Sequence, residues 1–143
     1  MSSLFQRVVL LCVLTLLSVH NIHGVHDNSI DLFRTHVNVV NTLEDNLDLT
    51  LHCKSKDDDL GEHLLHQNDS FSWSFRPKWP IGTTLFFCSF AWTGEFHYFD
   101  IFIDGDSGRT DSDDCNWNVH KSGPCRIPDH GEPICFPWNK GIK

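Results

Sequence analysis

Basic residues are scarce in this 143-residue chain. It contains 11 lysines and arginines against 19 aspartates and glutamates, which gives a formal net charge of −8. Proteins that bind nucleic acids depend mainly on clustered positive charge, and no basic stripe is present here. The composition therefore excludes nucleic acid as an ordinary partner. The hydrophobic fraction of 40% and the aromatic fraction of 12% are high enough to build the core of one domain.

Long apolar runs are also missing, with one short exception near the start. Residues 8–19 (VVLLCVLTLLSV) follow the positive charge of Arg7, and this order is typical of a secretory signal peptide. The run is shorter than the about 20 residues of a transmembrane helix, although an uncleaved signal anchor is an alternative. We expect residues 1–24 to be a signal peptide cleaved after Gly24. The mature domain, residues 25–143, is then soluble, secreted and extracellular, with no membrane insertion after cleavage.

No two cysteines form a CxxC pair, which argues against a zinc site. In an oxidising compartment most cysteines should form disulfides, but the mature chain has an odd number of them. We expect Cys125 and Cys135 to pair, because they end a short loop that contains Pro and Gly. The disulfide candidates are Cys53, Cys88, Cys115, Cys125 and Cys135. The residues alone leave the other pairings open.

No segment of the mature chain has the periodicity of an amphipathic helix. Instead, apolar and polar residues alternate, which predicts strands with one buried face. Residues 85–92 (LFFCSFAW) are almost continuously apolar, which is typical of a central strand buried on both faces. Alternating segments cover residues 37–39, 47–54, 71–75, 99–103 and 115–119, and turn-forming clusters lie at 67–70, 76–80, 104–114 and 122–124. The pattern predicts an all-β fold, a small disulfide-stabilised antiparallel β-sandwich or, alternatively, a barrel.

Catalytic patterns are lacking as well. His63 and His66 are three residues apart, so on a strand they point to opposite faces, and no third metal ligand stands at a recognisable spacing. Ser72 and Ser74 lie on an expected strand rather than in the G-x-S-x-G turn of a hydrolase. We therefore expect no enzyme activity.

Two expected turns contain candidate sites. Residues 104–108 (DGDSG) resemble the opening of a calcium loop, but Cys115 stands where the loop requires glutamate and no helices flank it. We expect no metal and no cofactor. Asn68, Asp69 and Ser70 form an N-glycosylation sequon in an exported chain, so Asn68 is the predicted glycosylation site.

A rigid sandwich without catalytic residues most naturally acts through its loops. The candidate loops are residues 54–59, 67–70, 76–80 and 104–114. Their acidic character favours a basic patch on the partner and a salt-dependent association. Trp79, between prolines, is the aromatic residue best suited to contact. The expected partner-binding residues are Lys54, Lys56, Asp57, Asp58, Asp59, Trp79, Asp104, Asp106 and Arg109.

Several motifs, taken in order, resemble the plant self-incompatibility S1 family, the S-protein homologues. They are VNVVN at 37–41, LTLHCKSKDDDLG at 49–61, FSWSF at 71–75, GTTLFFC at 82–88, CNW at 115–117, GPC at 123–125 and CFPWN at 135–139. The match covers essentially the whole mature chain, and the run from residue 52 to 61 followed by WSF and GTTLFFC is highly specific. The resemblance implies a secreted β-sandwich held by disulfides, without catalytic activity.

The same resemblance implies an extracellular signalling ligand that a plasma-membrane receptor protein recognises, in self-incompatibility or other cell–cell communication. We expect a monomer. Family members commonly have a cysteine beside an arginine shortly before the CxW triplet, whereas here Arg109 is followed by Thr110. On this comparison, we expect Cys53 to pair with Cys115 and Cys88 to be a buried thiol.

Two other functions compete with the ligand role. One is a cell-wall carbohydrate-binding module that stacks sugars on Trp79, Trp92 or Trp138. The other is a secreted hydrolase, which would need paired catalytic histidines. The strand aromatics are expected in the core instead; they are Phe71, Trp73, Phe75, Phe86 and Trp117.

Overall fold

The computed structural model describes residues 3, 6–9, 34–78, 80–109 and 113–141. The chain divides into two units, residues 1–32 and 33–143. In the first unit, residues 6–9 are helical. None of the helices in the described ranges is both long and apolar enough to cross a membrane. Most of the expected signal peptide with its cleavage site, Trp79 and Thr110 lie outside the described residues.

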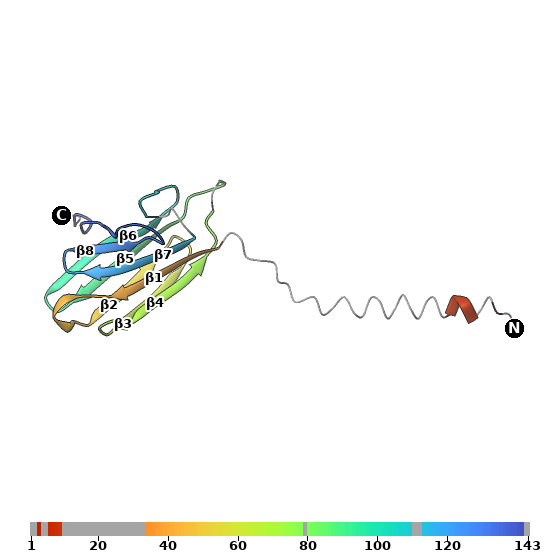
Figure 1. Cartoon of the computed structure of the whole chain (residues 1–143), viewed down its shortest axis with the longest axis horizontal. Coiled ribbons are helices and arrows are strands. Elements are labelled where there is room, and N and C mark those ends of the chain that lie inside the picture. The colour runs from red at the N-terminus through yellow and green to blue at the C-terminus, as the bar shows by residue number, and fades with distance from the viewer. Residues whose placement is uncertain (1–2, 4–5, 10–33, 79, 110–112, 142–143) are drawn as a thin grey trace. The chain divides into compact units, whose positions relative to one another are not determined.

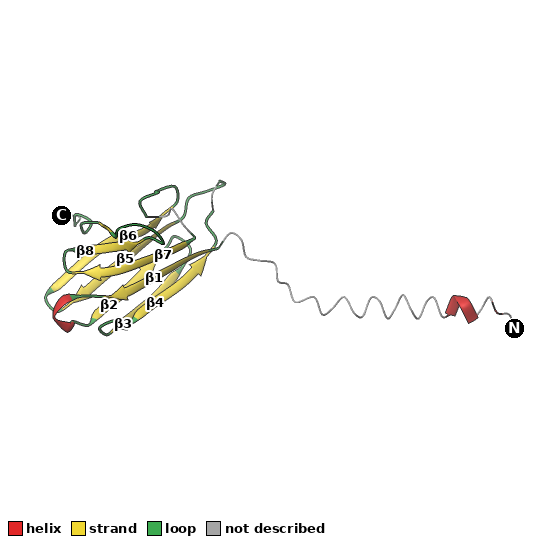
Figure 2. Ribbon diagram, in the orientation of Figure 1, coloured by secondary structure: helices red, strands yellow, loops and turns green. Residues whose placement is uncertain are grey.

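The second unit consists of two β-sheets, with strand orders β4-β1-β7-β8-β9 and β3-β2-β5-β6 (Figures 1 and 2). The strands are β1 (Thr35–Asn41), β2 (Leu49–Lys54), β3 (Asp59–Leu65), β4 (Ser70–Phe75), β5 (Leu85–Trp92), β6 (Glu95–Ile103), β7 (Asp114–His120), β8 (Gly123–Ile127) and β9 (Ile134–Cys135), and a short 3-10 turn, η2 (Glu44–Asn46), follows β1. The predicted all-β fold is confirmed.

The alternating residues form one core between the two sheets. Val37 and Val39 of β1 and Trp117 of β7 come from one sheet, and all three are fully buried. They belong to the same cluster as Leu51 of β2 and Phe90 of β5 from the other sheet. Because the inner faces of both sheets contribute to a single core, the architecture is a sandwich.

Strand β5 differs from the expectation. Its inner residues are buried, but Leu85 and Phe87 on the outer face are 43% and 39% exposed. The prediction that both faces are buried is therefore wrong. Apolar side chains on the exposed face hid the alternation, so the strand looked like a fully covered one.

One pairing also differs from the expected antiparallel arrangement. Strand β1 lies between β4 and β7, antiparallel to β4 and parallel to β7. The other strand pairs are antiparallel. Two parallel neighbours need a long connection, and here the chain between β1 and β7 includes every strand of the second sheet.

The disulfides follow from the strand register. Cys53 on β2 lies directly opposite Cys88 on β5 and is bonded to it, and Cys125 on β8 is bonded to Cys135 on β9. The expected pair of Cys125 and Cys135 is confirmed. The expectation that Cys53 pairs with Cys115 is wrong, because Cys53 is bonded to Cys88 on the neighbouring strand. Cys115, rather than Cys88, has the buried thiol that takes part in neither disulfide.

The C-terminal segment, residues 136–141, runs from the edge of one sheet to the edge of the other. The Phe136 ring packs against Phe99 and Trp117 in the core. Three residues further on, the backbone amide of Asn139 donates a hydrogen bond to the Tyr98 carbonyl on edge strand β6, at 3.0 Å. The segment therefore covers this side of the sandwich.

Trp138 belongs to this packing and not to an exposed platform. Its ring lies 5.0 Å from that of Phe90 and 4.8 Å from that of His97, measured between centroids. Its indole nitrogen donates to the Lys121 carbonyl at 2.9 Å. Trp92 is only 8% exposed. Of the three tryptophans considered for sugar stacking, Trp92 is therefore buried, Trp138 is partly buried against the core, and Trp79 lies outside the described residues.

Candidate functional site

Three of the four expected recognition loops meet at one end of the sandwich. The last residue of β2 pairs with the beginning of β5, and the beginning of β5 pairs with the end of β6. The turn β2–β3 and the loops β4–β5 and β6–β7 are therefore neighbours. We call residues 55–58, 76–78, 80–84, 104–109 and 113 together the loop end.

The fourth loop lies at the opposite end. In the turn between β3 and β4, the backbone amide of Asn68 donates a hydrogen bond to the backbone carbonyl of Asn41, where β1 ends, at 2.9 Å. Asn68 is exposed and has a left-handed backbone with φ 66°. Asparagine tolerates this conformation better than most residues. The predicted glycosylation site is thus accessible and separate from the loop end.

Hydrogen bonds and an ion pair join the three loops into one unit. The Lys78 ammonium forms an ion pair with the Asp57 carboxylate, which connects loop β4–β5 to turn β2–β3. The Thr84 amide donates to the Asp104 carboxylate, and the Asp104 amide donates to the Thr84 carbonyl at 3.0 Å. Thr84 also accepts a hydrogen bond from the Lys78 amide through its hydroxyl, at 2.9 Å. Each loop therefore restrains its neighbour.

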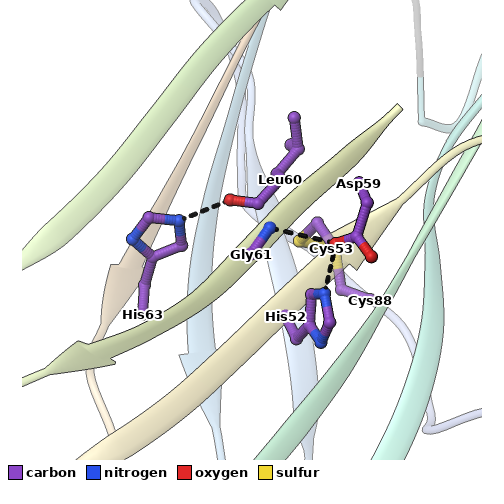
Figure 3. Close-up of a disulfide and its surroundings, with 7 residues drawn as sticks. All are labelled: His52, Cys53, Asp59, Leu60, Gly61, His63 and Cys88. Carbon is purple, nitrogen blue, oxygen red and sulfur yellow. Dashed lines mark hydrogen bonds and ion pairs between the residues drawn. A yellow bond between two sulfur atoms is a disulfide. The ribbon is translucent and has the colours of Figure 1, made fainter.

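Turn β2–β3 is fixed by its own charges (Figure 3). The Asp59 carboxylate lies 2.5 Å from the His52 ring and accepts a hydrogen bond from the Gly61 backbone amide at 3.1 Å. The same carboxylate lies 2.8 Å from the Lys54 ammonium. The hydrogen bonds from Lys54 and His52 hold the pKa of Asp59 well below its usual range. Similarly, Lys78 lowers the pKa of Asp57. Both carboxylates therefore remain ionised at any physiological pH.

An apolar residue stands at the tip of loop β4–β5. Ile81 is 98% exposed, although the tip is held in place. The amides of Ile81 and Gly82 both donate to the Lys78 carbonyl at 2.9 Å. A hollow of about 70 Å³ lies beside this loop, lined among others by Ser55, Asp58 and Arg76. Ile81 is not among the contact residues predicted from the sequence, although a lone apolar residue between Pro and Gly, outside any alternation, is a signal that could have indicated it.

The described part of loop β6–β7 packs on the core through Arg109. The Arg109 guanidinium lies 5.1 Å above the Phe99 ring and 5.2 Å above the Phe136 ring. It also pairs with Asp106 at 2.5 Å. Arg109, expected at a partner interface, thus faces inward. Asp104 and Asp106 are likewise engaged within the chain, and the described residues contain no group of three or more His, Cys, Asp or Glu that could hold a metal ion.

The histidines singled out in the sequence are also separate from one another. His63 stacks on Phe71, with ring centroids 3.6 Å apart, and its Nε2 lies 2.9 Å from the Leu60 carbonyl (Figure 3). His66 instead pairs with Asp48 at 2.8 Å, and this carboxylate raises the pKa of His66. Each ring is therefore occupied by a structural contact.

Comparisons with known proteins agree with these features. The model of the family described as plant self-incompatibility protein S1 matches residues 36–138. The chain is 44% identical to S-protein homolog 2 of Arabidopsis thaliana over 112 residues, which are 74% of this chain and 69% of that protein. It is 37% identical to S-protein homolog 29 over 134 residues, 92% of this chain and 94% of the relative. S-protein homolog 4, from the same plant, is 37% identical over 138 residues, covering 93% and 91%.

Proposed function

Since the chain belongs to the plant self-incompatibility protein S1 family, we propose that it is a secreted, non-catalytic signalling ligand. Its loop end binds a receptor protein in the plasma membrane of a plant cell, in self-incompatibility or another form of cell–cell communication. The observation that carries this proposal is the exposed Ile81 on a loop that is held in place by its neighbours. The ligand acts as a monomer.

The chemistry of the loop end suits a protein partner. Binding energy at protein interfaces comes mostly from a few anchor side chains surrounded by polar residues. Ile81 is such an apolar anchor, and the loop end also has exposed charges at Lys56, Asp57, Asp58 and Arg76. A loop that is already ordered loses little conformational entropy on binding. The loop end can therefore bind without first being rearranged.

Secretion is supported by two independent features. The apolar run at residues 8–19 has the length and flanking charge of a signal peptide. The two disulfides persist only in an oxidising compartment such as the cell exterior. A plasma-membrane receptor is then the partner class that a secreted ligand encounters.

The test is a binding titration on living cells. Fluorescently labelled, oxidised protein of residues 25–143 is added to plant protoplasts and to pollen tubes while cytosolic calcium is followed. We expect saturable binding that unlabelled protein displaces. The variant Ile81→Ala should bind at least tenfold more weakly, which is about 1.4 kcal/mol. Leu64→Ala is the matched control, because Leu64 is 59% exposed on strand β3, outside the loop end.

Three outcomes would contradict the proposal. Absence of saturable binding to protoplasts would refute a membrane receptor. Equal binding by Ile81→Ala and wild type would refute the role of the loop end. Binding that persists after the disulfides are reduced and the chain is unfolded would show that the folded surface is not what the cell recognises.

A further inference from the structure

The outer face of the sheet β3-β2-β5-β6 has an exposed aromatic patch. Phe87 on β5 is 39% exposed, and Phe96 and Tyr98 on β6 are 57% and 48% exposed. The solvent face of an antiparallel sheet is ordinarily polar. Contiguous exposed apolar side chains on a monomer commonly mark a binding site. This patch lies on a strand face and takes no part in the loop end.

The patch forms one side of a groove, which we call the β6 groove. Its volume is about 720 Å³, and it lies between β6 and the C-terminal segment. The hydrogen bond from the backbone amide of Asn139 to the Tyr98 carbonyl holds that segment beside β6. The rings of Phe96 and Tyr98 meet edge to face, 5.0 Å apart at 83°. They therefore form an apolar corner within the groove.

Polar groups in the same groove are available for a ligand. Asp100, Asn139 and Lys140 line it together with the aromatic rings. Within the described ranges, the side chains of these three residues have no hydrogen-bond or ion-pair partner, and neither has the Tyr98 hydroxyl. At the loop end, by contrast, Asp57, Lys78 and Asp104 are all engaged within the chain.

We propose that the β6 groove binds an uncharged polysaccharide chain, the chemistry of neutral cell-wall glycans. The apolar C–H faces of a pyranose ring pack against aromatic faces. Sugar hydroxyls both donate and accept hydrogen bonds, which matches a carboxylate, an amide, an ammonium and a phenol around one groove. This site is independent of the receptor site proposed above.

The charge of the groove favours a neutral occupant. Asp100 and Lys140 contribute one charge of each sign, while the whole chain has a net charge of −8. A polyuronate or an anionic lipid surface would be repelled by this net charge. A protein partner would need roughly 800 Å² of surface on each side, and three aromatic rings beside one segment offer less than that. A neutral glycan fits both the charge and the narrow shape.

The experiment is affinity electrophoresis of the folded protein, residues 25–143, in native gels that contain one soluble polysaccharide each. The probes are hydroxyethylcellulose and galactomannan, which are neutral, and polygalacturonate, which is acidic. We expect retardation by at least one neutral polysaccharide, from which a dissociation constant follows. Phe96→Ala and Tyr98→Ala should weaken it at least tenfold, and Asp100→Ala should weaken it without removing an aromatic ring. Leu64→Ala, an exposed apolar change on the same sheet, should stay within twofold of wild type.

Every other result overturns the proposal. No retardation of folded wild type by either neutral polysaccharide would refute it, as would equal retardation of all variants. Retardation by polygalacturonate alone would assign binding to charge. If light scattering shows that wild type is a dimer and that Phe96→Ala is a monomer, the patch is a dimer interface and not a glycan site. Because Phe96 and Tyr98 are exposed, these variants should fold, and near-UV circular dichroism checks this. If the aromatic variants do not fold, the binding of Asp100→Ala to the neutral polysaccharide still tests the proposal.

Discussion

The side chain of Asn41 connects several backbone segments through hydrogen bonds. It is fully buried at the end of β1. Its amide nitrogen donates to the carbonyls of Leu47 and Leu65, at 2.8 and 2.9 Å, and its amide oxygen accepts the Leu43 amide at 3.0 Å. Leu65 is on β3 in the other sheet. A buried polar group is tolerable only when it is hydrogen-bonded, and here those bonds also connect the two sheets.

Gly123 is required by a close approach of the backbone. A Cβ at this position would lie 2.0 Å from the Phe136 carbonyl oxygen, and φ is 141°. We expect Gly123→Ala to destabilise the protein by roughly 3 kcal/mol or more, because the C-terminal segment would have to move. Gly94→Ala is the control: it also has a positive φ, of 83°, but no atom within 4 Å. Its cost should be about 1 kcal/mol. Chemical denaturation of both variants measures the difference, and equal costs would contradict the clash.

The thiol of Cys115 should make stability depend on pH in the alkaline range. Burial raises its pKa from 9.0 to about 12. Because the pKa of the folded state is the higher one, the contribution to stability is complete below pH 9.0 and is lost as the pH rises toward 12. Above pH 9.0, wild type should lose up to about 1.4 kcal/mol per pH unit more than Cys115→Ala. Denaturation curves of both proteins test this, and parallel pH profiles would contradict it.

At the scale of strands, the alternation of apolar and polar residues predicts some strands and does not predict others. It predicts β1, β2, β4 and β7, whose inner faces are apolar and outer faces mostly polar, and residues 99–103 of β6. It misses β3, β8 and β9. Strand β3 contains Gly61 with φ 77°, β8 begins with Gly-Pro, and β9 has two residues. These strands form because partner strands lie beside them, and that information is not local in sequence.

The same limit applies to the candidate site. Turn-forming residues predict the loops, but only the strand register shows that three loops meet and that the fourth lies at the other end. Cys53 and Cys88 look unrelated until β2 and β5 are placed in register. Arg109 looks like a surface charge, yet its guanidinium packs on Phe99 and Phe136. Long-range contacts decide these cases.

The disulfide between Cys125 and Cys135 should stabilise the edge formed by β8 and β9. It closes a loop with a sequence separation of 10, and we expect the double variant Cys125→Ser, Cys135→Ser to lose about 3 kcal/mol of stability. The change should also weaken the packing of Phe136 on the core. Thermal unfolding and amide hydrogen exchange at residues 134–139 measure the two effects. Unchanged stability would show that the hydrogen bonds of the segment suffice without the covalent bond.

At the scale of the whole molecule, the two ends of the sandwich are available for different purposes. Asn68 is exposed at one end, and Ile81 stands at the other. A glycan on Asn68 should therefore leave receptor binding unchanged. Ser70→Ala removes the sequon while keeping Asn68 and its left-handed backbone.

We expect Ser70→Ala protein purified from plant cells to lack the Asn68 glycan. Its mass should be lower than that of wild type by the mass that a glycosidase removes from wild type. It should bind cells within twofold of wild type. Preparations of both proteins compared in one titration give the answer. A large loss of binding would place a receptor contact at the Asn68 end, whereas equal masses would show that the sequon is unused.

The thiol of Cys115, which takes part in neither disulfide, has a consequence for biosynthesis. As the nascent chain emerges, Cys53 and Cys88 become available before Cys115, and the strands that hold them are antiparallel neighbours. Their bond can form while the competing thiol is still inside the ribosome. When β7 arrives, it joins β1 and takes Cys115 into the core, where oxidants cannot reach it. We expect vectorial folding to give the correct disulfides with little help from an isomerase. Refolding of the complete reduced chain, in which all thiols compete at once, should give more mispaired product.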